Sequence, residues 1–242
     1  MSARRLALVA ALVLVAGPAH ADRMALWNIV HGACVPAQEK GEAMPPPCLE
    51  VAGATAVIKD RNGVAQLLAI PTARVTGIED AAILKPDAPN YFAAGWEQRG
   101  LMRRYLPAAP EREGLVVSIN SAYSRSQDQL HLHVDCLRAD VKAALVGYAP
   151  HLDGQWRPMT EPLAGRKYWA RRVDSPDLAG VDPFRLLADE MPDRGDMAHW
   201  TLAAVPLTFD GKPGFALLAD RAELTAGGHA EDVADHDCGI VR

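Results

Sequence analysis

Residues 124–136 read SRSQDQLHLHVDC, and apolar and polar side chains alternate through the second half of this stretch. Successive side chains of a strand point to opposite faces of a sheet. We therefore expect a strand over residues 130–136 that turns Leu130, Leu132 and Val134 to the core. The other face then carries a row of four polar groups, Gln129, His131, His133 and Asp135. Such a row is either a solvated sheet surface or the floor of a site, and two neighbouring histidines favour a site.

The segments before this strand predict an antiparallel sheet with a packed helix. β-rich runs over 53–60 and 64–70 flank Arg61-Asn62-Gly63, and Asn-Gly is a strong signal for a hairpin turn. Apolar residues recur at helical spacing over 90–106, which predicts a helix on the sheet. Residues 115–120 (LVVSIN) predict a further strand that a polar loop joins to the strand at 130–136. The fold class is thus α+β.

The C-terminal half repeats some of these signals. A helix is expected over 138–148, and Asp182-Pro183 is typical of a helix start. The runs HWTLAAVPLTF and GFALLAD surround Asp210-Gly211-Lys212 and predict a final hairpin. This echo of the first hairpin suggests a degenerate second half, which we expect to cover the sheet of the first half and to shape a pocket.

The N-terminus predicts export. Arg4 and Arg5 precede an apolar run over residues 6–16, and the small-residue sequence Ala19-His20-Ala21 follows. The run is shorter than the roughly 20 residues of a membrane-spanning helix, so we expect a signal peptide over 1–21 and one domain over 22–242. An uncleaved membrane anchor is the alternative. Either way, the domain is expected to work in a bacterial periplasm.

Four cysteines in an oxidising compartment predict two disulfides. Three pairings are open. We expect Cys34–Cys48, which closes a proline-rich loop, and Cys136–Cys238, which ties the C-terminal tail to the histidine strand. No pair has the short spacing of a zinc site. The formal net charge of −5 gives no electrostatic sign of nucleic-acid binding.

The ordered motifs resemble a known family. Asn120 at a strand end, Gln127 in a loop and then alternating histidines resemble the histidine triad (HIT) superfamily of nucleotidyl hydrolases and transferases. More narrowly, a set of segments across residues 28–242 is similar to the bacterial CDP-diacylglycerol pyrophosphatase family: IPTARVTGIED, SIN, SQDQLHLHVDC, GRKYWARRV, DPFRLLADEMP and DHDCGIVR. This resemblance implies a HIT-like sheet, no cofactor, and hydrolysis of CDP-diacylglycerol at a membrane surface to CMP and phosphatidate. Protein partners stay unknown.

The superfamily pattern has a histidine at each of three alternate positions, and this chain has two. If His131 and His133 are the second and third, Gln129 takes the first position. If they are the first and second, Asp135 takes the third. Because the family nucleophile is the middle histidine, it is His131 in one register and His133 in the other. The resemblance favours His131, because family members with similar flanking residues carry the extra histidine on the N-terminal side.

The side chains of the histidine strand also support a site that acts on phosphate, without reference to any family. A neutral imidazole is a competent nucleophile near neutral pH, and a neighbouring histidine on the same face can hold a phosphate oxygen or pass a proton. We expect the catalytic residues to be His131 and His133. The substrate-binding residues are expected to be Asn120, Gln127, Gln129, Arg74 and Lys59, with a hydroxyl from Ser126. A second basic cluster comprises Arg166, Lys167, Arg171 and Arg172, and it is either a lipid-headgroup site or a solvated face.

Two other functions stay open. A His-x-His strand also supplies zinc ligands, which Asp135, His151, His199, His229 or His236 would have to complete, but no third ligand stands at a diagnostic spacing. We therefore expect no metal, and a structural role for His236. The absent third histidine leaves a periplasmic nucleotide- or phospholipid-binding protein without turnover as the alternative function.

Overall fold

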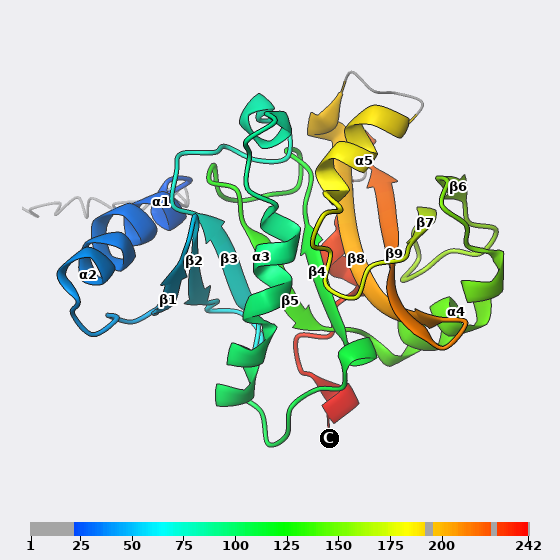
Figure 1. Ribbon diagram of the computed structural model, residues 1–242, viewed down its shortest axis with the longest axis horizontal. Coiled ribbons are helices and arrows are strands. Elements are labelled where there is room, and N and C mark those ends of the chain that lie inside the picture. The colour runs from blue at the N-terminus through cyan, green and yellow to red at the C-terminus, as the bar shows by residue number, and fades with distance from the viewer. Residues whose placement is uncertain (1–21, 192–195, 224–226, 242) are drawn as a thin grey trace, which may run out of the picture.

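A single antiparallel sheet of nine strands organises the computed structural model, which describes residues 22–191, 196–223 and 227–241. The spatial order is β1-β2-β3-β5-β4-β8-β9-β7-β6 (Figure 1). In chain order the strands are β1 (Cys48–Ala52), β2 (Thr55–Lys59), β3 (Leu67–Pro71), β4 (Leu115–Ile119), β5 (Leu132–Cys136), β6 (Arg157–Pro158), β7 (Trp169–Val173), β8 (Trp200–Phe209) and β9 (Lys212–Arg221). The prediction of an antiparallel α+β fold is confirmed. The predicted signal segment 1–21 lies outside the described residues.

Helices pack on both faces of this sheet. They are α1 (Ala25–Ile29), a π-helical turn (Val30–Cys34), α2 (Val35–Lys40), α3 (Tyr91–Gln98), α4 (Ala139–Tyr148) and α5 (Pro183–Glu190). Short 3₁₀ turns cover Ala81–Leu84, Arg99–Arg104, Arg112–Gly114, Ala149–His151, Met197–His199, Ala230–Val233 and Gly239–Val241. Within the described part of the chain, no helix is both long and apolar enough to cross a membrane.

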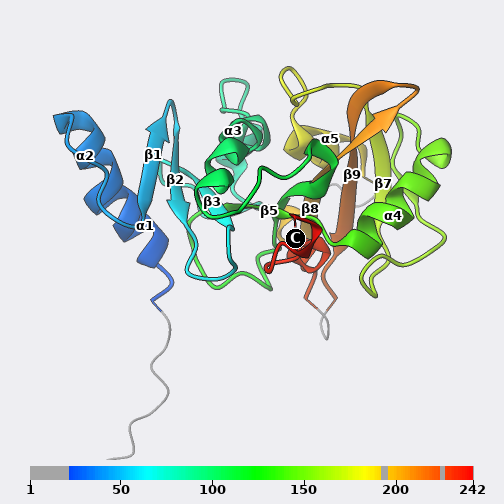
Figure 2. The same cartoon turned by 90° about the horizontal axis from the view of Figure 1, so that it is seen from below.

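The two faces of the sheet are buried by different elements. Helices α3 and α5 cover one face, where Phe92, Trp96 and Phe184 pack on alternate residues of the strands such as Leu132 and Val134. On the other face, α1 and α2 cover β2 and β3, and α4 covers β8 and β9. Figure 2 shows α3 and the C-terminal segment on opposite sides of the sheet. The helices of the second face thus lie toward its two ends and leave the middle strands to other segments.

Local signals explain most of the elements. Asn90 caps α3 by accepting a hydrogen bond from Ala93 N, and Asp182 caps α5, with Pro183 in its first turn. The predicted helix over 90–106 is α-helical to Gln98 and 3₁₀ from Arg99, with Gly100, a poor helix former, near this change. The predicted helix over 138–148 is present as α4.

Both predicted hairpins form, but the first has a longer connection. Strands β2 and β3 pair up to Lys59 and Leu67, so the loop spans residues 60–66 instead of a tight Asn-Gly turn. Val64 N in this loop donates to His236 O, so the loop rests on the C-terminal tail. The sequence reading also missed β1, which pairs with β2. In the predicted β8–β9 hairpin, Asp210 and Gly211 both have positive φ and form a two-residue turn.

The expected position of the second half is corrected by the sheet order. Strand β8 pairs edge to edge with β4, so the β8–β9 hairpin extends the sheet of the first half and does not cover it. Continuing the ladder satisfies the edge hydrogen bonds of β4. The duplication itself stays a prediction.

Both expected disulfides are present. Cys34–Cys48 joins the end of the π-helical turn to the start of β1, and Cys136–Cys238 joins the end of β5 to the C-terminal tail. The second bond links positions 102 residues apart, compared with 14 for the first. Each therefore fixes a terminal segment against the central sheet.

Removing the two disulfides is expected to cost unequal stability. In the chain-entropy model, a loop of about 15 residues corresponds to about 3 kcal/mol and one of about 100 residues to about 4.7 kcal/mol. We expect the Cys136→Ala/Cys238→Ala variant to lose more free energy of unfolding than Cys34→Ala/Cys48→Ala, measured by urea denaturation without reductant. The reverse order would contradict this prediction.

Candidate active site

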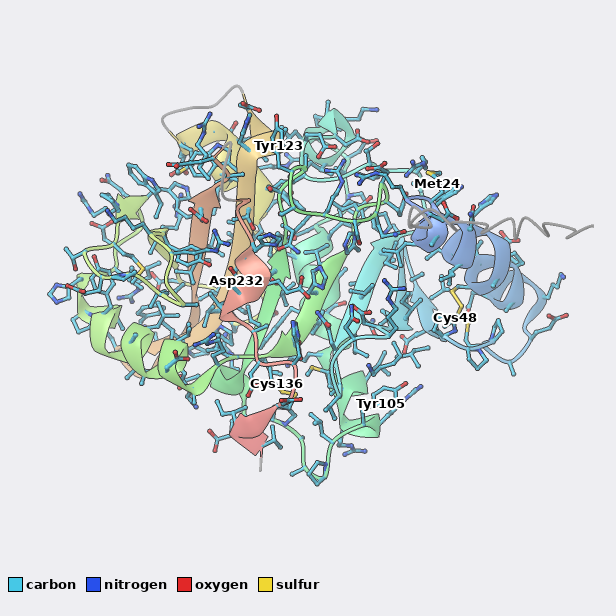
Figure 3. The ribbon with its side chains drawn as sticks, turned by 180° about the vertical axis from the view of Figure 1, so that it is seen from behind. Met24, Cys48, Tyr105, Tyr123, Cys136 and Asp232 are labelled. Carbon is cyan, nitrogen blue, oxygen red and sulfur yellow. A yellow bond between two sulfur atoms is a disulfide. The ribbon has the colours of Figure 1, made fainter. Side chains whose placement is uncertain are left out.

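A cavity of about 800 Å³ opens beside the middle strands, on the face opposite α3. Figure 3 shows this face, with α1 and α2 at one side, α4 at the other and the C-terminal segment (residues 227–241) between them. One wall is apolar and consists of Leu26, Ile29, Leu49, Ile58 and Leu68. The polar lining includes Lys59, Arg61, Asn120, Arg125, Ser126, Gln127, His131, His133, His229 and Glu231.

His131 is buried on the polar face of the histidine strand, as its alternation predicts. Its Nδ1 lies 2.7 Å from the carbonyl oxygen of Gln129. A carbonyl only accepts hydrogen bonds, so Nδ1 carries the proton and Nε2 of the neutral ring keeps its lone pair. Burial, together with the charge of His133, lowers the pKa of His131 to about 4. This imidazole is therefore neutral near neutral pH.

His133 lies beside His131 but has different partners. The two ring centroids are 5.1 Å apart. Nδ1 of His133 lies 3.1 Å from Oε1 of Glu231 and 2.8 Å from Nε2 of Gln66. Its Nε2 is buried and has no hydrogen-bond partner among the described residues. The two histidines thus share a cavity while only His133 contacts a carboxylate.

Glu231 is the site residue that sequence reasoning missed. It comes from the 3₁₀ turn Ala230–Val233 and accepts hydrogen bonds from Gln66 Nε2 (2.7 Å) and Asn120 Nδ2 (2.9 Å). Burial by itself raises the pKa of Glu231, but the charge of His133 and these hydrogen bonds outweigh it, so the pKa lies below its usual range. Its sole signal in the sequence is its nearness to Cys238, which the disulfide ties to the histidine strand.

Asp135 continues the polar row but does not line the cavity. Its Oδ2 lies 2.6 Å from Nδ1 of His236, which covers it. His236 Nε2 in turn lies 3.7 Å from Oε1 of Glu231. The contact fits the structural role expected of His236, because it fastens the C-terminal segment to β5.

Gln129 and Arg74 are not brought to the cavity. The amide of Gln129 donates to the carbonyl oxygens of Pro71 and Ala73 and accepts from Arg74, which also donates to Asp128 O. These bonds tie the segment after β3 to the loop before β5. The buried side chain of Gln129 therefore has a structural role. Its backbone carbonyl, and not its side chain, accepts the hydrogen bond from His131.

Two further predicted residues line the cavity but already have partners. Gln127 accepts a hydrogen bond from Leu26 N (3.1 Å) and so holds the start of α1. Lys59 Nζ donates to the carbonyl oxygens of Asp60 (2.5 Å), Asn62 (3.3 Å) and Gly63 (3.0 Å). Both side chains therefore stabilise the walls of the cavity.

Only one lysine or arginine of the lining lacks an anionic or carbonyl partner among the described residues. Arg125 pairs with Glu79 and Asp128, and Lys59 is held by carbonyls as above. Arg61, in the loop after β2, is exposed and has no such contact. Its guanidinium is therefore available to an anionic ligand, a feature that its position in the sequence did not reveal.

The basic cluster near β7 lies outside the cavity lining. Arg166 pairs with Asp220 and Asp232, and Arg171 pairs with Glu190. Arg172 pairs with Asp174 and Asp210. These acidic side chains neutralise the charges of the arginines. The ion pairs favour a solvated surface over a site for lipid headgroups.

A metal centre finds little support in the side-chain geometry. Within the described ranges, one group of three potential ligands comes together, namely Asp135, Cys136 and Cys238. Its two cysteines are bonded to each other, so neither offers a thiolate. The predicted absence of a metal stays a prediction.

Comparison with known proteins decides the family. The family model described as CDP-diacylglycerol pyrophosphatase matches residues 21–242. The chain belongs to this family. A curated CDP-diacylglycerol pyrophosphatase from Yersinia pestis is 38% identical over 245 residues, which covers 98% of this chain and 93% of the relative. The match of a CDP-diacylglycerol pyrophosphatase family model confirms the narrower resemblance read from the segments, whereas membership of the histidine triad superfamily stays a prediction.

The His236–Asp135 contact predicts a pH-dependent contribution to stability. The hydrogen bond and charge of Asp135 raise the pKa of His236 above its ordinary value, against a smaller opposing effect of burial. The raised folded-state pKa means that this contribution is complete below about pH 6.5 and is lost as pH rises through the folded pKa. We expect the stability difference between wild type and His236→Gln to be constant below about pH 6.5 and to shrink as the pH rises above it.

Urea denaturation at a series of pH values measures this difference. His151→Gln, which changes an exposed histidine outside the cavity, is the matched control. A difference that stays constant across the range would contradict the proposed linkage.

Proposed function

We propose that this protein hydrolyses the pyrophosphate bond of CDP-diacylglycerol to CMP and phosphatidate, with His131 as the nucleophile. The observation that carries the proposal is a buried, neutral imidazole in a large cavity, whose Nδ1 proton is held by a backbone carbonyl. Membership of the CDP-diacylglycerol pyrophosphatase family supports the substrate. The proposal includes membership of the histidine triad superfamily. With Gln129 at the first of the three alternate positions, His131 takes the middle position, which is that of the family nucleophile.

The first step is attack of His131 Nε2 on the CMP-side phosphorus. A bond forms between this nitrogen and phosphorus, the bond from phosphorus to the bridging oxygen breaks, and phosphatidate leaves with the electron pair. The ring then carries a positive charge, which the hydrogen bond from Nδ1 to Gln129 O stabilises. Near neutral pH this attack needs no prior deprotonation of the nucleophile.

The second step returns the enzyme to its starting state. Water attacks the same phosphorus, the phosphorus–nitrogen bond breaks, and its electron pair returns to Nε2 of His131. His133 lies close enough to serve both steps, first as a hydrogen-bond donor to the leaving oxygen and then as the acceptor of a proton from water. CMP is then released.

Cations and neutral polar groups of the cavity complete the site. Asn120 and Ser126 offer donors and acceptors to the ribose and phosphate oxygens. Arg61, and not the expected Arg74 or Lys59, supplies the cationic charge, because its guanidinium has no competing partner among the described residues. The apolar wall provides a surface for an uncharged part of the ligand.

The proposal includes a location on the periplasmic side of the bacterial inner membrane. An export signal or anchor read from residues 1–21 and a lipid substrate both favour it. Asp22, the first described residue, lines the cavity. An N-terminal segment held in a bilayer would therefore keep the cavity near the lipid surface.

The decisive measurement is CMP release from CDP-diacylglycerol in detergent micelles. We expect His131→Ala to reduce kcat on the order of 10⁴-fold because it removes the nucleophile, and His133→Ala on the order of 10²-fold because it removes acid–base help. Chelator should leave the wild-type rate unchanged, since no step uses a metal.

Three outcomes would change this assignment. Inactive His133→Ala with partly active His131→Ala would move the nucleophile to His133. Loss of wild-type activity in chelator would favour a metal-dependent phosphoesterase. A wild type that binds CMP tightly but releases none from the lipid would support the binding protein without turnover.

Arg61 gives a separate prediction about binding. Because a free guanidinium contacts the anionic ligand, Arg61→Ala should raise KM about 10-fold, the loss of one charge-assisted hydrogen bond. Arg104→Ala removes the same charge from an exposed residue near the cavity that does not line it, and it is the matched control. Equal effects of the two variants on KM would mean that substrate binding depends on the overall electrostatic field of the protein and not on a direct contact with Arg61.

A further inference from the structure

We propose that Glu231, in the C-terminal segment, is the positioning residue that makes His133 the acid–base partner of His131. The inference rests on the proposed function, and it assigns a task to a residue outside the histidine strand and its flanking loops. Glu231 is 111 residues from Asn120 in the chain but hydrogen-bonds to it in the cavity. The C-terminal segment is thereby part of the active site and not merely a tail.

The contacts of Glu231 identify it as an ionised carboxylate. Oε1 faces Gln66 Nε2 at 2.7 Å and His133 Nδ1 at 3.1 Å, while Oε2 faces Asn120 Nδ2 at 2.9 Å. Two amide groups and one imidazole therefore surround its oxygens. Amide N–H groups only donate, so the site favours the form of Glu231 that only accepts.

A carboxylate at Nδ1 has a defined effect on the rest of the ring. Nδ1 of the neutral ring accepts a hydrogen bond from Gln66 Nε2 at 2.8 Å, whereas Nδ1–H of the imidazolium form faces Glu231 Oε1 at 3.1 Å. The second proton of the imidazolium form is on Nε2, which has no hydrogen-bond partner among the described residues. The negative charge stabilises this form and keeps the ring oriented, as carboxylates do for imidazoles in catalytic triads. Nε2–H is then ready to donate to the leaving oxygen.

The proton balance closes over the two steps. Nε2 of His133 gives its proton to the bridging oxygen as phosphatidate leaves, and the ring becomes neutral. The same nitrogen takes a proton from the attacking water in the second step, and the ring returns to the imidazolium form. Glu231 keeps its negative charge throughout and exchanges no proton.

The different partners of the two histidines assign their roles. Nδ1 of His131 faces the neutral carbonyl of Gln129, whereas Nδ1 of His133 faces the carboxylate of Glu231 as well as the amide of Gln66. A neutral partner in a buried setting favours a neutral nucleophile, and a charged partner favours a protonated acid. Distinct environments for two titratable groups are the usual way to separate acid and nucleophile.

The position of Glu231 is fixed by several contacts of the C-terminal segment. Ala230 N donates to Thr201 Oγ1 at 2.7 Å, and Ala230 and Val233 are buried in the core beside α4. Arg138 N donates to Val233 O, and the disulfide to Cys136 fastens the segment further along. The carboxylate is therefore held rigidly against β5 and does not swing on an exposed tail.

Other charged groups surround this pair and enter its pH dependence. His131 and Asp135 lie on the histidine strand, and His236 lies on the C-terminal segment. Arg125 belongs to the loop before β5, and Asp60 and Lys59 belong to the end of β2 and its loop. The test must therefore compare variants that differ in one charge only.

The test compares Glu231→Gln with Asp232→Asn in the full-length protein. Asp232 is the next residue, pairs with Arg166 and does not line the cavity, so its variant removes one negative charge from the same segment. We expect Glu231→Gln to lower kcat for CMP release on the order of 10²-fold with KM nearly unchanged. Asp232→Asn should stay within about twofold of wild type, and Glu231→Asp should recover part of the lost rate.

Two readouts separate this role from a structural one. In Glu231→Gln, the kcat–pH profile should change shape, because the negative charge that faces the His133 ring at 3.1 Å is removed. Nitrogen-15 NMR of labelled histidines should show the Nδ1 signal of His133 unchanged in Asp232→Asn, changed in Glu231→Gln, and changed by less in Glu231→Asp, all at the same pH. A rate loss that is equal at every pH, or an unchanged NMR signal of His133, would overturn the proposal.

The NMR readout needs no substrate and is informative even if the function is different. A wild type without CMP release would refute the proposed hydrolysis, while the Glu231–His133 pairing would still be decided by the spectra. If Glu231→Gln fails to fold, Glu231→Asp against Asp232→Asn decides through the same spectra, because a displaced carboxylate must alter the His133 signal.

Discussion

The structure depends on the register of β5. A shift of one residue would turn Leu132 and Val134 into the cavity and bury both histidines under α3. The register is fixed on one face by the packing of α3 and on the other by the contacts of Asp135 with His236. Because β5 lies between β3 and β4 in a continuous ladder, both of its edges are also paired. The position of the histidines follows from these constraints.

Burial then gives two chemically identical side chains different properties. Both histidines are nearly inaccessible to water, where a charge is costly unless a partner compensates it. The carbonyl of Gln129 satisfies a neutral ring, whereas Glu231 offers His133 a compensating charge. The cavity therefore needs no unusual residue to contain two distinct functional groups. Their distinction comes from one backbone oxygen and one carboxylate.

Segments from both ends of the chain build this environment. Helix α1 and β1 supply much of the apolar wall, and the C-terminal segment supplies Glu231 and the cover over Asp135. One disulfide fastens each of these segments to the sheet. Cross-links of this kind suit an oxidising compartment and restrict the unfolded chain, so they favour the arrangement on which the site depends.

Local patterns in the sequence determined the alternation of the histidine strand, the starts of α3 and α5, the hairpin around Asp210-Gly211-Lys212 and the expectation of two disulfides. Each of these is a property of a few neighbouring residues or of loop closure, so it can be read without the fold. Only the tertiary structure decided that Gln129 and Arg74 turn away from the cavity and that Glu231 meets His133. It also left Arg61 without an anionic or carbonyl partner in the part of the chain that the structure describes. It also decided that the second hairpin extends the sheet and does not cover it. Those outcomes depend on which distant groups compete for the same hydrogen bonds, and that competition is settled only when the chain is packed.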